Sequence, residues 1–208
     1  MSEFTLIIGN KHLSSWSLRA WLMIKRCNVK FSEITLDLER QDVKAAILQL
    51  SPSGKVPALK HNDLLIWDSL SVGEYLAELF PSDKLWPTDK DARAIARSVS
   101  NEMHSGFVNL RKMMPFALFE QRALPHSEEL RVEIRRIEEI WLDCRSRFGK
   151  NGKFLFGEFS IADAMFTPVV LRFQTYGYKP ENKDVVDYCN AILAYPDLLE
   201  WIESAKNN

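Results

Sequence analysis

The sequence predicts an α/β domain followed by an all-α domain. Strand-like and helix-like segments alternate only within the first 80 residues, and no strand pattern follows residue 67. Residues 81–91 are polar and contain two prolines, which is typical of a linker. Beyond them, apolar residues recur at helical spacing. We therefore expect an α/β domain at residues 1–80, a linker at 81–91 and an all-helical domain at 92–208.

The first three elements are typical of a β-α-β unit. Residues 4–8 form a nearly continuous apolar run, as expected of a strand buried on both faces. Residues 16–27 show helical spacing, and the basic residues Lys25 and Arg26 near their end suit the helix dipole. In residues 31–36 apolar and polar side chains alternate well enough to predict a second strand. This order predicts that the two strands are parallel.

The next segments complete the α/β domain. Residues 39–50 form an amphipathic helical pattern, residues 56–60 and 64–67 predict two short strands, and a helix opens at 68–69. Because Pro57 lacks a backbone N–H, we expect its strand to lie at a sheet edge or to be distorted. Such an edge could pair with an extended peptide ligand. An ordinary turn proline is the simpler alternative.

The second half of the chain predicts only helices. Ser160 and Asp163 have the spacing of a capping box, which indicates a helix start with a structural role. The first of these helices should end or kink at Met113–Phe116, because Pro115 interrupts the helical pattern there. The expected helices span residues 92–112, 128–148, 161–175, 181–193 and 197–205.

Composition excludes several function classes. The 208 residues include 27 Lys and Arg and 28 Asp and Glu, giving a net charge of -1, so neither nucleic acid nor an anionic membrane is expected as the main partner. The three cysteines lie far apart without a C-x-x-C pair, which fits a reducing compartment. No signal peptide or membrane span is recognisable, and the four histidines lack metal-ligand spacing. We expect a cytoplasmic protein without a metal.

Two hydroxyls stand where the first helix begins. Ser14 and Ser15 follow the loop after the first strand, and a helix N-terminus stabilises anions such as a thiolate. We interpret this stretch as a site that activates the thiol of a bound peptide. Plain N-capping by serine is the alternative, and considered alone it is the better one. Ser17 lies deeper in the helix and should point elsewhere.

A second pair of polar residues opens the third helix. Ser69 is expected at the N-cap, where its hydroxyl and the following N–H groups could hold a carboxylate. Asp68 could face an ammonium group, so the pair matches an α-amino acid. Capping is again the alternative.

The order of these motifs resembles the cytosolic glutathione transferases. The resemblance rests on Ser14-Ser15-Trp16-Ser17 with Arg19, on the stretch 51–59 around Val56-Pro57, on Asp68-Ser69 with residues 74–76, and on 157–163 in the second half. The Ser-Ser-x-Ser-x-Arg string is most similar to the zeta class and its bacterial relatives. The resemblance implies a thioredoxin-like N-terminal domain, an all-α C-terminal domain and a homodimer formed through residues near 69–79 and 92–112.

The resemblance also implies a chemistry and its residues. Glutathione is the co-substrate, and the hydroxyl of Ser14 or Ser15 donates to its sulfur. The sulfur attacks a small electrophile, either to form a conjugate, as in detoxification, or to isomerise it. Val56, after a cis Val56–Pro57 bond, pairs with the cysteinyl backbone, and Asp68 and Ser69 hold the γ-glutamyl end. Candidates for the glycyl carboxylate are Lys55, His12 and Arg40, and the second-substrate pocket is assigned to Leu13, Trp16, Met103, Phe107 and Met114.

Two departures limit the resemblance. Zeta enzymes that isomerise maleylacetoacetate resemble Ser-Ser-Cys-Ser, whereas here Trp16 replaces the cysteine. Asp68 stands where zeta relatives tend to carry glutamine. A non-catalytic glutathione transferase-like binding module is the alternative function, because a fold alone does not fix a function. A disulfide reductase is disfavoured because residues 14–17 contain no cysteine.

Overall fold

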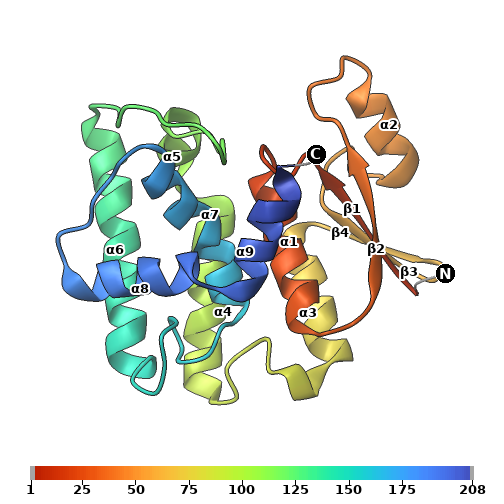
Figure 1. Cartoon of the computed structure of the whole chain (residues 1–208). Helices are drawn as coiled ribbons and strands as arrows, with labels where there is room; N and C mark the ends of the chain where they lie inside the picture. Colours follow the sequence, from red (N-terminus) through yellow and green to blue (C-terminus); the bar gives the residue numbers. More distant parts are fainter. Residues whose placement is uncertain (1–2, 207–208) are drawn as a thin grey trace. The chain divides into compact units, whose positions relative to one another are not determined.

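The computed structural model describes residues 3–206, which divide into two compact units (Figure 1). The first unit contains the described residues up to Leu85 and those from Glu200 onward. The second unit contains Trp86 to Leu199. The segment expected to be a linker holds the short 3₁₀ helix η1 (Pro81–Asp83) and the boundary between the units.

The first unit is built on a four-stranded sheet with the order β2-β1-β3-β4. Strand β1 pairs with β2 in parallel, as predicted, whereas β3 is antiparallel to both β1 and β4. Strand β3 lies inside the sheet, so an edge position for the strand after Pro57 is wrong. The strand begins one residue after the proline, where each residue has an N–H for pairing. The strands are β1 (Phe4–Gly9), β2 (Phe31–Leu36), β3 (Ala58–His61) and β4 (Leu64–Trp67).

Two helices pack against each other in this unit. Helix α1 (Ser15–Arg26) and helix α3 (Ser69–Leu79) are in contact, and Figure 1 shows them together beside the sheet. Most apolar side chains of β1 and α1 are buried and form the core. Helix α2 (Val43–Leu50) is shorter than the expected helix 39–50, because the chain forms turns before it. In those turns Arg40 pairs with Asp42 over 2.7 Å.

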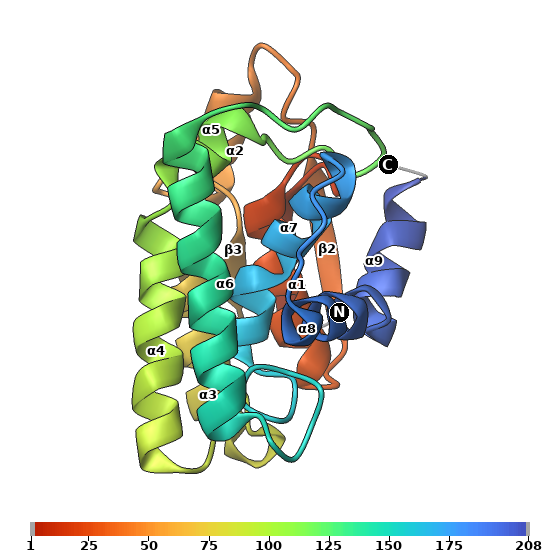
Figure 2. The same cartoon turned by 90° about the vertical axis from the view of Figure 1, so that its left-hand side faces the viewer.

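The second unit is helical, as predicted. Helix α7 is almost entirely buried and contacts α4 and α8, while Figure 2 shows α4 and α6 running alongside each other. Helix α9 begins in the second unit and ends in the first. The helices are α4 (Lys90–Ser105), α5 (Val108–Met113), α6 (Glu128–Phe148), α7 (Ile161–Thr175), α8 (Lys183–Leu193) and α9 (Pro196–Ala205).

The expected helix at 92–112 is interrupted. Gly106 caps α4, and Phe107 adopts a left-handed conformation with φ 58° before α5 begins. The carboxylate of Glu133 on α6 accepts from the backbone N–H groups of Asn109 and Leu110, at 3.1 and 2.7 Å. The first turn of α5 therefore receives its cap from another helix, so a new helix starts here.

The predicted capping box at α7 is present. Asp163 accepts from the backbone N–H of Ser160 at 2.9 Å and from the N–H of Leu155 at 3.0 Å. The carboxyl is fully buried, and this burial raises its pKa from 3.8 to about 6, although the hydrogen bonds oppose the shift. Asp163 thus joins the start of α7 to the preceding loop.

Candidate active site

The register of the sheet brings three polar segments to one end of the first unit. Ile7 lies opposite Ala58, and Ala58 lies opposite Trp67. The loop before α1 follows the end of β1, the Val-Pro step precedes β3, and the start of α3 follows β4. All three segments therefore lie at the same end of adjacent strands. The N-termini of α1 and α3 therefore lie at this end too, which makes it favourable for anionic groups.

Ser14 occupies the start of α1. It is the N-cap residue, with φ -98° and ψ 90°, and its hydroxyl oxygen accepts from the backbone N–H of Ser17 at 3.3 Å. Ser15 is the first helical residue, and both serines are 5% exposed. The capping interaction uses a lone pair of Ser14 and leaves its hydroxyl proton available to another acceptor.

Ser17 lies deeper in the helix, and its side chain contacts the cap rather than solvent. Its hydroxyl oxygen lies 2.7 Å from the hydroxyl oxygen of Ser14, and it accepts from the backbone N–H of Gly9 at 3.1 Å. The side chain has no exposed surface. One turn of a helix returns residue i+3 to the same face, which is why Ser17 reaches Ser14.

The Val-Pro step leaves backbone groups available. The Val56–Pro57 peptide bond is cis, as predicted. Val56 is half-buried and makes no backbone hydrogen bond within residues 3–206. Its N–H and C=O can therefore pair with an extended ligand backbone. Lys55 beside it is exposed, and its backbone N–H donates to Ser53 at 3.2 Å.

Helix α3 begins one residue earlier than expected, so Ser69 is not its N-cap. Asp68 is the N-cap and accepts from the N–H of Leu70 at 2.9 Å, whereas Ser69 is the first helical residue. Asp68 has φ 75°, an uncommon conformation for a residue with a side chain. The hydroxyl of Ser69 is buried and has no hydrogen-bond partner within residues 3–206. Buried hydroxyls are normally paired, so this one is suited to a ligand.

The three candidates for the glycyl carboxylate differ in their surroundings. Arg40 donates twice to Asp42, at 2.9 and 2.7 Å, and this partner raises the pKa of its guanidinium. His12 is half-buried, and the ammonium of Lys55 has no ion-pair partner among the described residues. Lys55 and His12 are therefore better placed to receive a ligand charge than Arg40.

A buried lysine that the sequence did not single out holds the loop before Ser14. Lys11 is 5% exposed and pairs with Glu33 at 2.8 Å. Its ammonium also donates to Ser204 at 3.1 Å, and its carbonyl accepts from the indole of Trp201 at 3.2 Å. The last helix thus fastens this loop within the first unit. No local pattern marks a lysine as buried, because its partners are distant in the sequence.

The residues assigned to the second-substrate pocket belong to different units. Leu13 and Trp16 are half-buried in the first unit, where the guanidinium of Arg19 lies 4.3 Å from the centre of the Trp16 ring. The others, Met103, Phe107 and Met114, are buried in the second unit.

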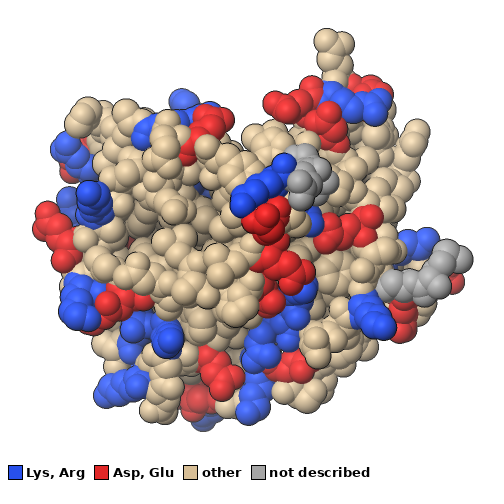
Figure 3. Space-filling model, viewed as in Figure 1, with Lys and Arg blue, Asp and Glu red and all other residues tan. Residues whose placement is uncertain are grey.

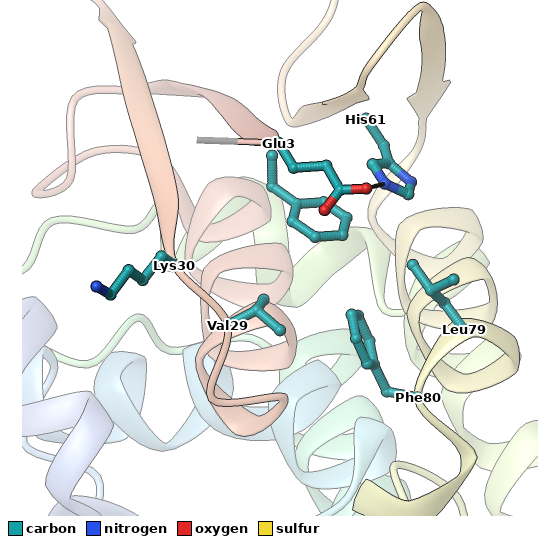
Figure 4. A pocket seen from close by; sticks show the side chains of 7 residues that line it. Glu3, Val29, Lys30, His61, Leu79 and Phe80 are labelled. Carbon is teal, nitrogen blue, oxygen red and sulfur yellow. Dashed lines mark hydrogen bonds and ion pairs between the residues drawn. The ribbon is translucent and has the colours of Figure 1, made fainter. Parts of the chain in front are cut away.

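A pocket at the opposite end of the sheet has a different character. It has a volume of about 410 Å³, and Figure 4 shows His61, Glu3 and Phe80 on its wall. His61 lies between the Tyr75 hydroxyl at 2.6 Å and the Glu3 carboxylate at 2.7 Å. Hydrogen bonding by His61 holds the pKa of the Glu3 carboxyl below its ordinary value. This pocket contains none of the predicted site residues.

Other features of the described residues indicate no further chemistry. Within residues 3–206, no three His, Cys, Asp or Glu side chains are grouped as metal ligands, and no helix has the length and apolar character to cross a bilayer. Basic and acidic side chains are intermixed on the face shown in Figure 3. The three cysteines are buried, and burial raises the pKa of each thiol to about 12.

Comparison with known proteins identifies the family to which both halves are similar. The glutathione S-transferase N-terminal domain matches residues 13–79, and the glutathione S-transferase C-terminal domain matches residues 125–204. A probable maleylacetoacetate isomerase of Caenorhabditis elegans is 28% identical, with 93% of this chain and 89% of the relative aligned. The maleylacetoacetate isomerase of Rattus norvegicus is also 28% identical, over 86% of this chain and 82% of its own.

A solved structure shows the same fold. A glutathione transferase homolog from Burkholderia, with bound glutathione, superposes with a TM-score of 0.73 over 98% of each chain, at 22% identity. At this level of identity the similarity establishes the fold alone.

Proposed function

Because the chain belongs to the glutathione S-transferase family, we propose that it binds glutathione where α1 and α3 begin and activates its thiol through Ser14. The hydroxyl of Ser69 carries this proposal, since it is buried at the start of α3 without a partner among the described residues. A γ-glutamyl carboxylate bonded there would satisfy the hydroxyl and receive the favourable field of the helix N-terminus.

The remaining glutathione contacts follow from the same end of the sheet. Val56 offers its unused backbone groups to the cysteinyl residue, and Asp68 offers a carboxylate to the γ-glutamyl ammonium. Lys55 and His12 are the proposed partners of the glycyl carboxylate. This arrangement would place the thiol between Val56 and the hydroxyl of Ser14.

The proposed chemistry begins with ionisation of the thiol. A free thiol of this kind has a pKa of roughly 8.5, so most of it is protonated at neutral pH. The hydroxyl of Ser14 and the α1 N-terminus stabilise the thiolate, while the proton leaves to solvent. The thiolate then forms a bond to an electrophilic carbon, and either a leaving group departs with its electron pair or the adduct is protonated.

The chain's own residues favour conjugation as the basic activity. Trp16 stands where the zeta motif has a cysteine, and its ring packs on Arg19. The cysteines of the protein are buried, and burial raises the pKa of the Cys27 thiol, at the end of α1, to about 12. The site therefore relies on the thiol of glutathione alone. Isomerisation, the activity named for the relatives, would use the same thiolate by addition and later departure.

The pocket for the electrophile is assigned from chain position and from the family resemblance. We assign Leu13 and Trp16 to it, because both are half-buried beside Ser14 in the chain. The contribution of Met103, Phe107 and Met114 stays a prediction from the family resemblance. We also propose the homodimer on that basis.

One experiment separates an enzyme from a binding module. Glutathione affinity is measured by calorimetry, and conjugation of a generic aryl halide is followed in wild type and Ser14→Ala. An enzyme of the proposed type binds glutathione in both proteins and loses turnover at neutral pH in the variant. Binding without turnover in wild type would identify a non-catalytic module. Absence of binding would reject the site.

A further inference from the structure

A chain of hydrogen bonds leads from the sheet to the cap of α1. The backbone N–H of Gly9 donates to the Ser17 hydroxyl oxygen at 3.1 Å, and the Ser17 hydroxyl lies 2.7 Å from that of Ser14. Ser17 has no exposed surface, whereas Ser14 is 5% exposed. Ser14 is therefore the end of this hydrogen-bond series that can reach a ligand.

The two hydroxyl protons of Ser14 and Ser17 can be arranged in two ways. Each hydroxyl has one proton and two lone pairs. In one arrangement Ser17 donates to Ser14, and the Ser14 proton is free for a ligand. In the other, Ser14 donates to Ser17, and a sulfur at the site receives no hydroxyl proton. The Ser14 oxygen also accepts from the N–H of Ser17 at 3.3 Å, which leaves one lone pair for the Ser17 hydroxyl.

We propose that Ser17 is a positioning residue that donates its hydroxyl proton to Ser14 and thereby directs the Ser14 hydroxyl to the glutathione thiolate. The backbone N–H of Gly9 can only donate, and a thiolate can only accept. When glutathione is bound, every hydrogen bond in this series therefore points the same way, from Gly9 through Ser17 and Ser14 to the sulfur. This inference rests on the proposed function, because it needs a thiolate beside Ser14.

The same arrangement strengthens the bond to sulfur. A hydroxyl that accepts two hydrogen bonds is more polarised and is a better donor, an effect of about 10–30% per bond. A hydrogen bond donated to the thiolate lowers the pKa of the thiol by about 1–2 pH units. Loss of the Ser17 hydroxyl should therefore raise the thiol pKa by about 0.1–0.6 pH unit. If Ser17 instead accepted from Ser14, its removal would free the Ser14 proton and lower the thiol pKa.

The test is an ultraviolet titration of the thiolate of bound glutathione in wild type, Ser14→Ala, Ser17→Ala and Ser17→Thr. Ser17→Thr retains the hydroxyl and should keep the wild-type pKa. Ser146→Ala is the matched control, since Ser146 is an exposed helical serine of the second unit that donates to a backbone carbonyl. Ser17→Cys, a weaker donor of similar size, replaces Ser17→Ala if thermal melting shows that the latter does not fold.

The outcomes separate this inference from the proposed function. A raised thiol pKa in Ser14→Ala, a smaller rise in Ser17→Ala or Ser17→Cys and recovery in Ser17→Thr would support it. An unchanged or lowered pKa without the Ser17 hydroxyl, together with a rise in Ser14→Ala, would overturn the role of Ser17 and leave the function standing. An unchanged pKa in Ser14→Ala would reject activation by Ser14, and the role of Ser17 with it.

Discussion

Replacing Ser69 with alanine should weaken glutathione binding without weakening the fold. In the free protein the Ser69 hydroxyl is buried and has no hydrogen-bond partner among the described residues. Its removal therefore breaks no bond in the free protein, and alanine is the better helix former. The whole effect of Ser69→Ala should appear in the complex, where the hydroxyl is proposed to donate to the γ-glutamyl carboxylate.

The size of the loss follows from the kind of bond. A hydrogen bond to a charged group contributes about 1.5–3 kcal/mol. Since a factor of ten in affinity corresponds to about 1.4 kcal/mol, the dissociation constant should rise about 10- to 150-fold. The backbone N–H groups of α3 remain in the variant, so binding should be weakened rather than abolished.

Calorimetric titration of glutathione into wild type and Ser69→Ala measures this loss, and a thermal melt measures stability. Ser71→Ala is the matched control, because Ser71 lies on the same helix and is exposed. We expect normal affinity in the control and an unchanged or higher melting temperature in both variants. Equal affinity in all three proteins, with the fold intact, would mean that the Asp68–Ser69 pair only caps α3.

Three further predictions concern stability and assembly. The folded pKa of Asp163, about 6, lies above its ordinary 3.8, so the folded state holds this proton more tightly and the free energy of unfolding should fall as the pH rises between these values. Asp163→Asn should remove that part of the pH slope in urea denaturation, and an identical slope would contradict the assignment. Glu33→Leu removes the carboxylate that pairs with the buried Lys11 ammonium and accepts from the Trp21 indole at 2.7 Å, so it should cost about 3 kcal/mol in denaturant unfolding, with partial recovery in the double variant that also carries Lys11→Met. Equal stability of the single variant and wild type would refute this. A homodimer involving residues near 69–79 and 92–112 should sediment as a dimer at micromolar concentration, and a monomer would reject it.

Features with a short-range cause were predictable. The parallel β1–β2 pair follows from the strand, helix, strand order, and the structure has it. The capping box of Ser160 and Asp163 needs only two residues at the right spacing, and its hydrogen bonds are present. The serine cap of α1 is likewise a local signal, and Ser14 occupies it.

Features with a long-range cause were missed. The break between α4 and α5 depends on Glu133, which reaches the N–H groups of α5 from another helix. The burial of Lys11 depends on Glu33 and on Ser204, which lies 193 residues away. The position of the α3 cap was missed for a local reason: Asp68 has a positive φ, a backbone conformation that residue type alone does not specify.

The most direct test of the central claim is the ionisation of glutathione bound to the wild-type protein and to Ser14→Ala. The ultraviolet absorbance of the thiolate is titrated against pH in both complexes. The account predicts a bound-thiol pKa below the roughly 8.5 of a free thiol in wild type, with a shift back toward that value in Ser14→Ala. A wild-type complex whose thiol titrates like free glutathione would contradict the claim that this site activates sulfur.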